Sequence, residues 1–161
     1  EKAYHLKNQG VSSKQEYWHD TVAYNYRMTN ICAAIGLAQL EKATEIIEKK
    51  REIAAWYKED LIGLPLKTHD EQPETTHSFW MCSIAVDDAK NRQPLRDKVK
   101  NDGIETRPLF YPAHTMPHCA VNESFPIAEA IGSKGINLPS YPALTRNEVK
   151  LVTQSIRKFF E

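Results

Sequence analysis

An almost continuous apolar segment between residues 29 and 41 limits what this chain can fold into. Its apolar residues surround nearly the whole circumference of a helix: Ile31, Ala33, Ala34, Ile35, Leu37, Ala38 and Leu40. A surface helix has one polar face, whereas a helix that is apolar all round is typical of a protein interior. We therefore expect a buried helix. In a chain of only 161 residues, a second subunit is one source of the neighbours that it needs.

The segments on either side of this helix have different patterns. Residues 1–28 are polar and aromatic without sustained helical or strand periodicity, which favours loop structure. Residues 43–61 are amphipathic, which predicts a long helix with one exposed face. The apolar stripe of that helix consists of Ile46, Ile53, Tyr57 and Leu61.

A boundary is expected after the second helix. Gly63, Pro65 and Pro73 interrupt a polar stretch there, and such residues are typical of turns and linkers. We therefore divide the chain into residues 1–62, which include a helical arm, and a compact module of residues 63–161.

Short strands and helices alternate through this module. The predicted strands are residues 77–86, 104–110 and 135–138, and the predicted helices are residues 93–100 and 125–131 together with one that follows Thr145. Thr145 and Glu148 have the spacing of a capping box, in which each side chain bonds to the backbone of the other residue. The mixture predicts an α+β fold.

Charge and cysteine content exclude several classes of function. Lysine plus arginine and aspartate plus glutamate both total 21, so the chain lacks the basic excess of a nucleic-acid-binding protein. The uncharged apolar stretch at residues 28–40 is far shorter than the roughly 20 apolar residues that span a bilayer. Three widely spaced cysteines give no disulfide framework and favour a reducing compartment, so we expect the cytoplasm.

The start of the sequence has neither a methionine nor the apolar core of a signal peptide. We therefore expect that the chain is a piece of a longer protein.

Asn25 and Arg27 are the first candidate ligand-binding residues, because they lie just before the apolar helix. Helix N-termini have unpaired N–H groups and a positive partial charge, so polar donors at this position can complete a phosphate site. An ordinary loop that caps the helix explains the same residues.

Arg107, Tyr111 and His114 form a second candidate group around a proline-rich segment. An arginine fork suits phosphate, while tyrosine and histidine can form hydrogen bonds with sugar hydroxyls. The alternative is that these residues belong to a surface loop without a ligand.

A zinc site is disfavoured in this region. His114, His118 and Cys119 are the only cluster of metal-ligand types, but Pro117 prevents a regular helix from placing both histidines on one face. The sequence contains no dinucleotide-binding, Walker or nucleophile-elbow motif either.

Four longer segments carry a family resemblance over almost the whole chain. They read YWHDTVAYNYRMTNICAAIGLAQLE at 17–41, HSFWMCSIAV at 77–86, TRPLFYPAH at 106–114 and GINLPSYPALT at 135–145. The chain resembles the C-terminal part of the DegT/DnrJ/EryC1/StrS family of sugar aminotransferases. The resemblance implies a fold-type-I architecture in which residues 1–62 end the large domain and connect to a small α+β domain at 63–161.

The resemblance also implies a chemistry. Members of this family use pyridoxal phosphate, work as dimers with active sites at the subunit interface, and transfer nitrogen from glutamate to a keto nucleotide-sugar. Here the expected substrate is GDP-4-keto-6-deoxymannose, a 4-keto-6-deoxy nucleotide-sugar, and the aminated product is expected to serve surface polysaccharide such as O-antigen. The family's cofactor-binding lysine lies upstream of the segment that matches Lys7–Gly10, so we assign no catalytic residue and expect this chain alone not to bind the cofactor stably.

Individual roles follow from the matched segments. The loop with Asn25 and Arg27 is expected to reach the cofactor phosphate of the partner subunit, with Asn25 as the main donor. Tyr111 and His114 match a segment that faces the nucleotide-sugar, and Arg107 is a candidate for its diphosphate.

Two alternatives remain at this point. One is a non-catalytic nucleotide-sugar-binding or interaction module with the same small-domain fold. The other is an aminotransferase for a different 4-keto-6-deoxy nucleotide-sugar.

Overall fold

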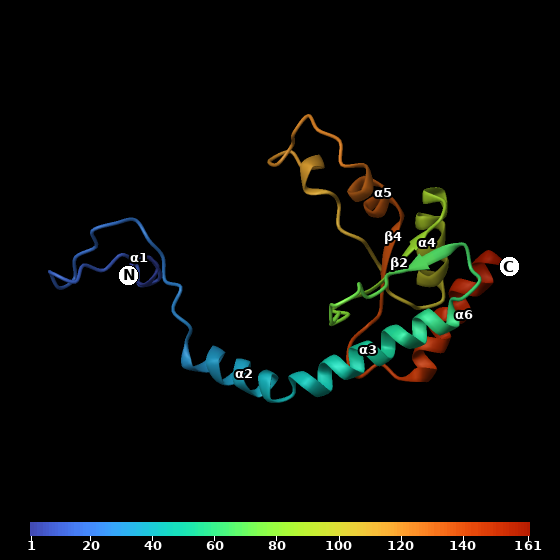
Figure 1. The fold of residues 1–161 in the computed structure, drawn as a ribbon, viewed down its shortest axis with the longest axis horizontal. Coiled ribbons are helices and arrows are strands. Elements are labelled where there is room, and N and C mark those ends of the chain that lie inside the picture. The colour runs from blue at the N-terminus through green and yellow to red at the C-terminus, as the bar shows by residue number, and fades with distance from the viewer. The chain divides into compact units, whose positions relative to one another are not determined.

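Two units, Glu1–Ala43 and Thr44–Glu161, make up the computed structural model, which describes all of residues 1–161 (Figure 1). The first unit contains helix α1 (Lys2–Lys7) and helix α2 (Asn30–Glu41). Between these helices the chain is irregular apart from two isolated bridges, which pair Asn8 with Asn25 and Val11 with His19. The prediction of loop structure for residues 1–28 is therefore confirmed except at α1.

Helix α2 forms where the apolar pattern predicts it, but none of its residues is buried. The Thr29 hydroxyl caps the helix by accepting a hydrogen bond from the N–H of Cys32 at 3.2 Å. Ile31 remains 75% exposed and Leu40 71% exposed. The prediction of a buried helix is thus wrong for this chain by itself. A local apolar pattern indicates that a helix tends to pack against other elements, but it does not show which elements those are.

This exposed apolar surface leads to a prediction about association. The 161-residue chain should self-associate in solution, because contiguous exposed apolar surface favours contacts that remove it from water. Light scattering over a concentration series should show a mass that rises above that of a monomer, and replacing Ile31 and Ile35 by lysine should reduce this rise. A monodisperse monomer at all concentrations would contradict the prediction.

The second unit combines a four-stranded sheet with four α-helices. Its elements are α3 (Ala43–Asp60), β1 (Leu66–Thr68), β2 (Cys82–Val86), the 3₁₀ turn η1 (Ala89–Asn91), α4 (Arg92–Asn101), β3 (Arg107–Pro108), the 3₁₀ turn η2 (Ala113–Thr115), α5 (Pro126–Lys134), β4 (Gly135–Leu138) and α6 (Arg146–Phe160). The strand order is β1-β2-β4-β3, and every neighbouring pair is antiparallel. The α+β prediction is confirmed.

One face of this sheet carries the hydrophobic core. The register places Cys82 opposite Leu138 and Ile84 opposite Ile136, so these four side chains share a face. Helices α3, α4 and α6 contribute seven further members of the buried cluster: Ile53, Tyr57, Leu95, Val99, Val149, Val152 and Ile156. The amphipathic pattern of α6 is confirmed, and its capping box of Thr145 and Glu148 is present.

The units divide at residues 43 and 44, whereas the sequence suggested a boundary between residues 62 and 63. The difference arises because Ile53 and Tyr57 of α3 belong to the same core as the strands. Gly63, with φ of 83°, lies in the turn between α3 and β1.

Two strands are shorter than predicted, and a third was not predicted. The predicted strand 77–86 begins only at Cys82, because Phe79 has a left-handed φ of 46° and its N–H donates to His77 Nδ1 at 2.8 Å. The predicted strand 104–110 contains only Arg107 and Pro108, since proline has no N–H to continue a ladder. Strand β1 lies in the stretch that was interpreted as a linker.

No helix is both long enough and apolar enough to cross a bilayer.

Candidate functional site

Asn25 and Arg27 form a small cluster in the first unit. The Oδ1 atom of Asn25 accepts hydrogen bonds from the backbone N–H of Arg27 at 3.2 Å and from its Nε at 3.0 Å. The segment is tied to the end of α1, where the Tyr26 N–H donates to the Lys7 carbonyl at 2.9 Å. Both Asn25 and Arg27 are exposed. The structure therefore brings together the two residues that were predicted to bind the cofactor.

This pair has the donor set that a phosphate group requires. With Asn25 Oδ1 engaged by Arg27, the remaining polar groups are the Nδ2 amide of Asn25 and the terminal guanidinium nitrogens of Arg27, all of which are donors. Hydrogen bonds from a guanidinium to phosphate are charge-assisted and stronger than neutral ones. The residues present thus fit the phosphate of pyridoxal phosphate.

His114 is held in a defined orientation in the second unit. Its Nε2 lies 3.0 Å from Oε1 of Glu129, and only 14% of its side chain is exposed. Glu129 is fixed in turn by the N–H of Phe125 at 2.8 Å, and this bond, together with His114, lowers the pKa of the carboxyl group. The Phe125 ring lies 4.7 Å from the imidazole. Glu129 and Phe125 were not among the residues that sequence reasoning selected.

Tyr111 and Arg107 differ from His114 because they are largely exposed. Tyr111 is 59% exposed, and the Arg107 side chain is 80% exposed with Glu105 3.6 Å away. No hydrogen bond or ion pair joins these three residues to one another. The structure therefore places them on one continuous segment, from β3 to η2, without assembling them into a contact network.

A polar row across the sheet supports the strand that carries Arg107. The register aligns Ser83, Asn137 and Arg107 on neighbouring strands, so their side chains share the face opposite the core. Ser83 Oγ donates to Asn137 Oδ1 at 2.6 Å, and Asn137 Nδ2 donates to the Pro108 carbonyl at 3.3 Å. Asn137 is only 7% exposed. A single asparagine within an apolar strand was the sequence signal for this row.

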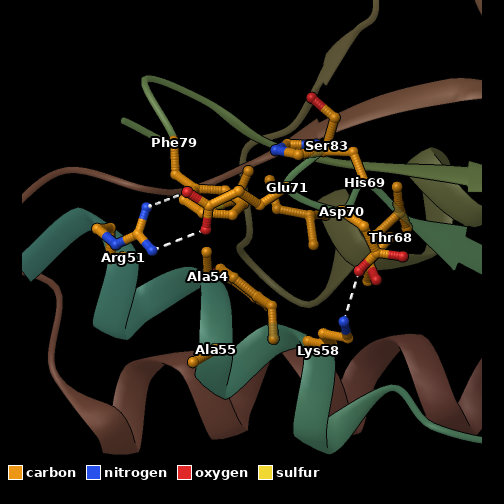
Figure 2. Close-up of a pocket in the computed structure, with 14 residues that line it drawn as sticks. Arg51, Ala54, Ala55, Lys58, Thr68, His69, Asp70, Glu71, Phe79 and Ser83 are labelled. Atoms are coloured by element: carbon orange, nitrogen blue, oxygen red, sulfur yellow. Dashed lines mark hydrogen bonds and ion pairs between the residues drawn. The ribbon is translucent and has the colours of Figure 1, made fainter. Parts of the chain in front are cut away.

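A separate cavity of about 230 Å³ lies between α3, the segment that precedes β2 and β2 itself (Figure 2). Its walls are mainly apolar, and two ion pairs lie among its lining residues. Arg51 forms two hydrogen bonds to Glu71, at 3.1 and 2.7 Å, and Lys58 lies 2.5 Å from Asp70. These contacts hold residues 70 and 71 against α3.

This cavity does not fit a charged nucleotide-sugar. Its basic side chains are already paired with carboxylates, and the Glu71 pairing lowers the pKa of that carboxyl group. His69 stacks on Phe79 with ring centroids 5.2 Å apart, and burial lowers the pKa of its imidazole. We interpret these residues as supports of the fold.

No group of three or more histidine, cysteine, aspartate or glutamate side chains is placed to hold a metal ion.

Comparison with known proteins connects these residues to a family. The model of the DegT/DnrJ/EryC1/StrS aminotransferase family matches residues 1–157. The chain belongs to this family. Members of the family use pyridoxal phosphate, which agrees with the donor set of Asn25 and Arg27.

Two relatives in this family share 48% identity with the chain. One is the GDP-perosamine synthase of Vibrio cholerae, with 99% of this chain and 45% of that protein covered. The other is the GDP-perosamine synthase of Escherichia coli O157:H7, with 97% of this chain and 43% of that protein covered. The chain thus spans less than half the length of these curated relatives.

The fold is also shared with solved structures of aminotransferases. The aminotransferase TlmJ from Streptoalloteichus hindustanus superimposes with a TM-score of 0.89 at 24% identity, over 98% of this chain and 43% of that one. The predicted resemblance to the C-terminal part of a family member is confirmed.

Proposed function

We propose that the protein containing this chain transfers an amino group from glutamate to GDP-4-keto-6-deoxymannose, giving GDP-perosamine and 2-oxoglutarate. The product would serve surface polysaccharide such as O-antigen. The observation that carries this proposal is the 48% identity to two GDP-perosamine synthases over 99% and 97% of the chain. We further propose that the protein is cytoplasmic and works as a homodimer or a larger oligomer.

Each part of the chain has a proposed place in this enzyme. Residues 1–62 would end the large domain and provide the connecting helices, and residues 63–161 would form the small domain. Bound pyridoxal phosphate supplies the electron sink for amino transfer. Asn25 and Arg27 would hold its phosphate group through the donors described above.

The nucleotide-sugar would lie along the segment from β3 to η2. His114, fixed by Glu129 at 3.0 Å, and the exposed Tyr111 would form hydrogen bonds with the sugar. Arg107 would bind the diphosphate, because its exposed guanidinium offers paired donors that match phosphate oxygens.

Product analysis tests this function. The whole protein should be incubated with GDP-4-keto-6-deoxymannose and glutamate, and the product identified by mass spectrometry and NMR. We expect GDP-perosamine and an equal amount of 2-oxoglutarate. Parallel reactions should replace the substrate with dTDP- and UDP-linked 4-keto-6-deoxy sugars.

Two results would contradict the proposal in different ways. Amination of only a dTDP- or UDP-linked sugar would indicate an aminotransferase for another substrate. Binding of the nucleotide-sugar without transfer to any of these sugars would indicate a non-catalytic binding module.

The role of Asn25 leads to a prediction about cofactor binding. Asn25→Ala removes an amide donor and the acceptor that orients Arg27, so we expect pyridoxal phosphate affinity to fall about tenfold, as for loss of one hydrogen bond to a charged group. Dialysis of the whole protein followed by absorbance spectroscopy of the retained cofactor measures this change. Asn122→Ala, at an exposed loop position, is the matched control. Equal retention by the two variants would contradict the role.

A further inference from the structure

Trp80 and Phe110 present two large aromatic rings on the surface of the second unit. Their centroids are 6.5 Å apart and their planes are inclined by only 20°. Trp80 is 71% exposed and Phe110 is 65% exposed. Exposed apolar groups that cluster in this way are typical of binding sites, whereas scattered single ones are ordinary.

The backbone of Trp80 is anchored by a lysine of α3. Lys50 of α3 donates through Nζ to the Trp80 carbonyl at 2.7 Å. The same ammonium group also bonds to the carbonyl of Ser140 and lies 3.3 Å from its hydroxyl. One lysine therefore connects the segment before β2 to the segment after β4, which fixes the point from which the indole ring projects.

The backbone next to Phe110 is anchored as well. The Leu109 N–H donates to the Gly135 carbonyl at 3.0 Å. The Phe110 carbonyl lies so near α5 that a Cβ atom added at Gly132 would be 3.3 Å from it. The backbone that carries each ring is thus fixed by the fold before any ligand binds, which reduces the entropy lost on binding.

The place of the pair along the chain suggests its ligand. Phe110 adjoins Tyr111 and is three residues from Arg107, for which we propose contacts to the sugar and the diphosphate. A nucleotide-sugar has its base on the other side of the diphosphate from its sugar, so the base needs a further surface. Aromatic side chains supply such a surface by stacking, which requires only a flat π face on the base.

We propose that Trp80 and Phe110 form the stacking surface for the purine base of the nucleotide-sugar. This inference rests on the proposed function, and it assigns the base a site that is distinct from the phosphate and sugar contacts.

Tryptophan fluorescence of the whole protein tests the stacking directly. Titration with GDP alone, without sugar or amino donor, should quench the emission in a saturable manner. The quenching should disappear in Trp80→Phe, which keeps an aromatic ring but removes the fluorophore. It should persist in Trp18→Phe, which removes another exposed tryptophan from the first unit. Ribose 5-phosphate, which lacks a base, should not quench.

Kinetics provide a second readout. Because base stacking on an aromatic side chain contributes strongly to affinity, Trp80→Ala should raise the KM for the nucleotide-sugar about tenfold. The KM for glutamate and kcat should stay unchanged, and Trp80→Phe should recover most of the affinity. Phe110→Leu should raise the same KM in the same direction.

The outcomes separate this inference from the proposed function. GDP quenching that depends on Trp80 supports the stacking surface even in a protein that aminates no sugar. Normal amination with no Trp80-dependent quenching overturns it, and so would a Trp80→Ala variant with unchanged KM. That last result would indicate that the rest of the protein covers the ring pair.

Discussion

Replacing Gly135 by alanine should destabilise the second unit by about 3 kcal/mol, at the upper end of the usual cost of overpacking. A Cβ atom at this position would lie 2.5 Å from Leu109 Cβ, 2.7 Å from Leu109 Cδ2 and 2.9 Å from the Ile131 carbonyl oxygen. Gly135 has an ordinary extended backbone, with φ of −79° and ψ of 141°. Glycine is therefore required here because there is no room for a Cβ atom, and not because the backbone conformation excludes other residues.

The neighbours of Gly135 cannot move apart easily. Ile131 belongs to the last turn of α5, and the Leu109 N–H is bonded to the Gly135 carbonyl itself. Thermal unfolding of the protein, with hydrogen exchange of peptides from β2 and β4, measures the loss. Gly36→Ala is the control, because nothing lies within 4 Å of its Cβ position and alanine favours the helix by up to about 1 kcal/mol. Equal melting temperatures for Gly135→Ala and wild type would contradict the prediction.

Replacing Asp60 by alanine should lower the free energy of unfolding of the second unit by about 3 kcal/mol, which is near the lower end of the range for breaking a buried ion pair. Two guanidinium nitrogens of Arg146 donate to the Asp60 carboxylate at 2.6 Å each, and the Thr153 hydroxyl donates at 3.1 Å. The Asp60 side chain is only 17% exposed. Its removal leaves the partly buried Arg146 without its main partner and separates the end of α3 from α6.

Glu59→Ala is the matched control for Asp60→Ala. Glu59 also accepts from Arg146, at 3.2 Å, but its side chain is 70% exposed. Solvent screens such a contact, so its loss should cost less than about 1 kcal/mol. Urea unfolding of both variants measures the free energy of unfolding. A similar decrease for the two variants would show that burial does not set the strength of the contacts that Arg146 makes with Asp60 and Glu59.

The same pair gives the protein a defined sensitivity to acid. The hydrogen bonds from Arg146 lower the pKa of Asp60 below its ordinary value of 3.8. A carboxyl group whose pKa is lower in the folded state stabilises the fold above the pKa of the unfolded state. That contribution is lost as the pH falls through the folded pKa. The stability difference between wild type and Asp60→Ala should therefore be constant near neutral pH and decrease below about pH 4.

Much of the fold could be predicted from the sequence because helix signals are local. The apolar periodicity of α3 and α6 and the capping box of Thr145 and Glu148 involve residues three or four positions apart. The candidate residues Asn25 and Arg27 are only two positions apart, and they do contact each other. The family also follows from contiguous segments, which is why the resemblance held over residues 1–157.

The tertiary structure decided which distant residues meet. Glu129 orients His114 from 15 positions away, and Ser83 bonds to Asn137 from 54 positions away. The Trp80 and Phe110 rings meet although they come from opposite sides of α4 in the sequence. Such pairs depend on strand register and on how helices pack against the sheet, and no local pattern encodes either. For the same reason the sequence showed that α2 is apolar all round, whereas only the structure showed that none of its residues is buried.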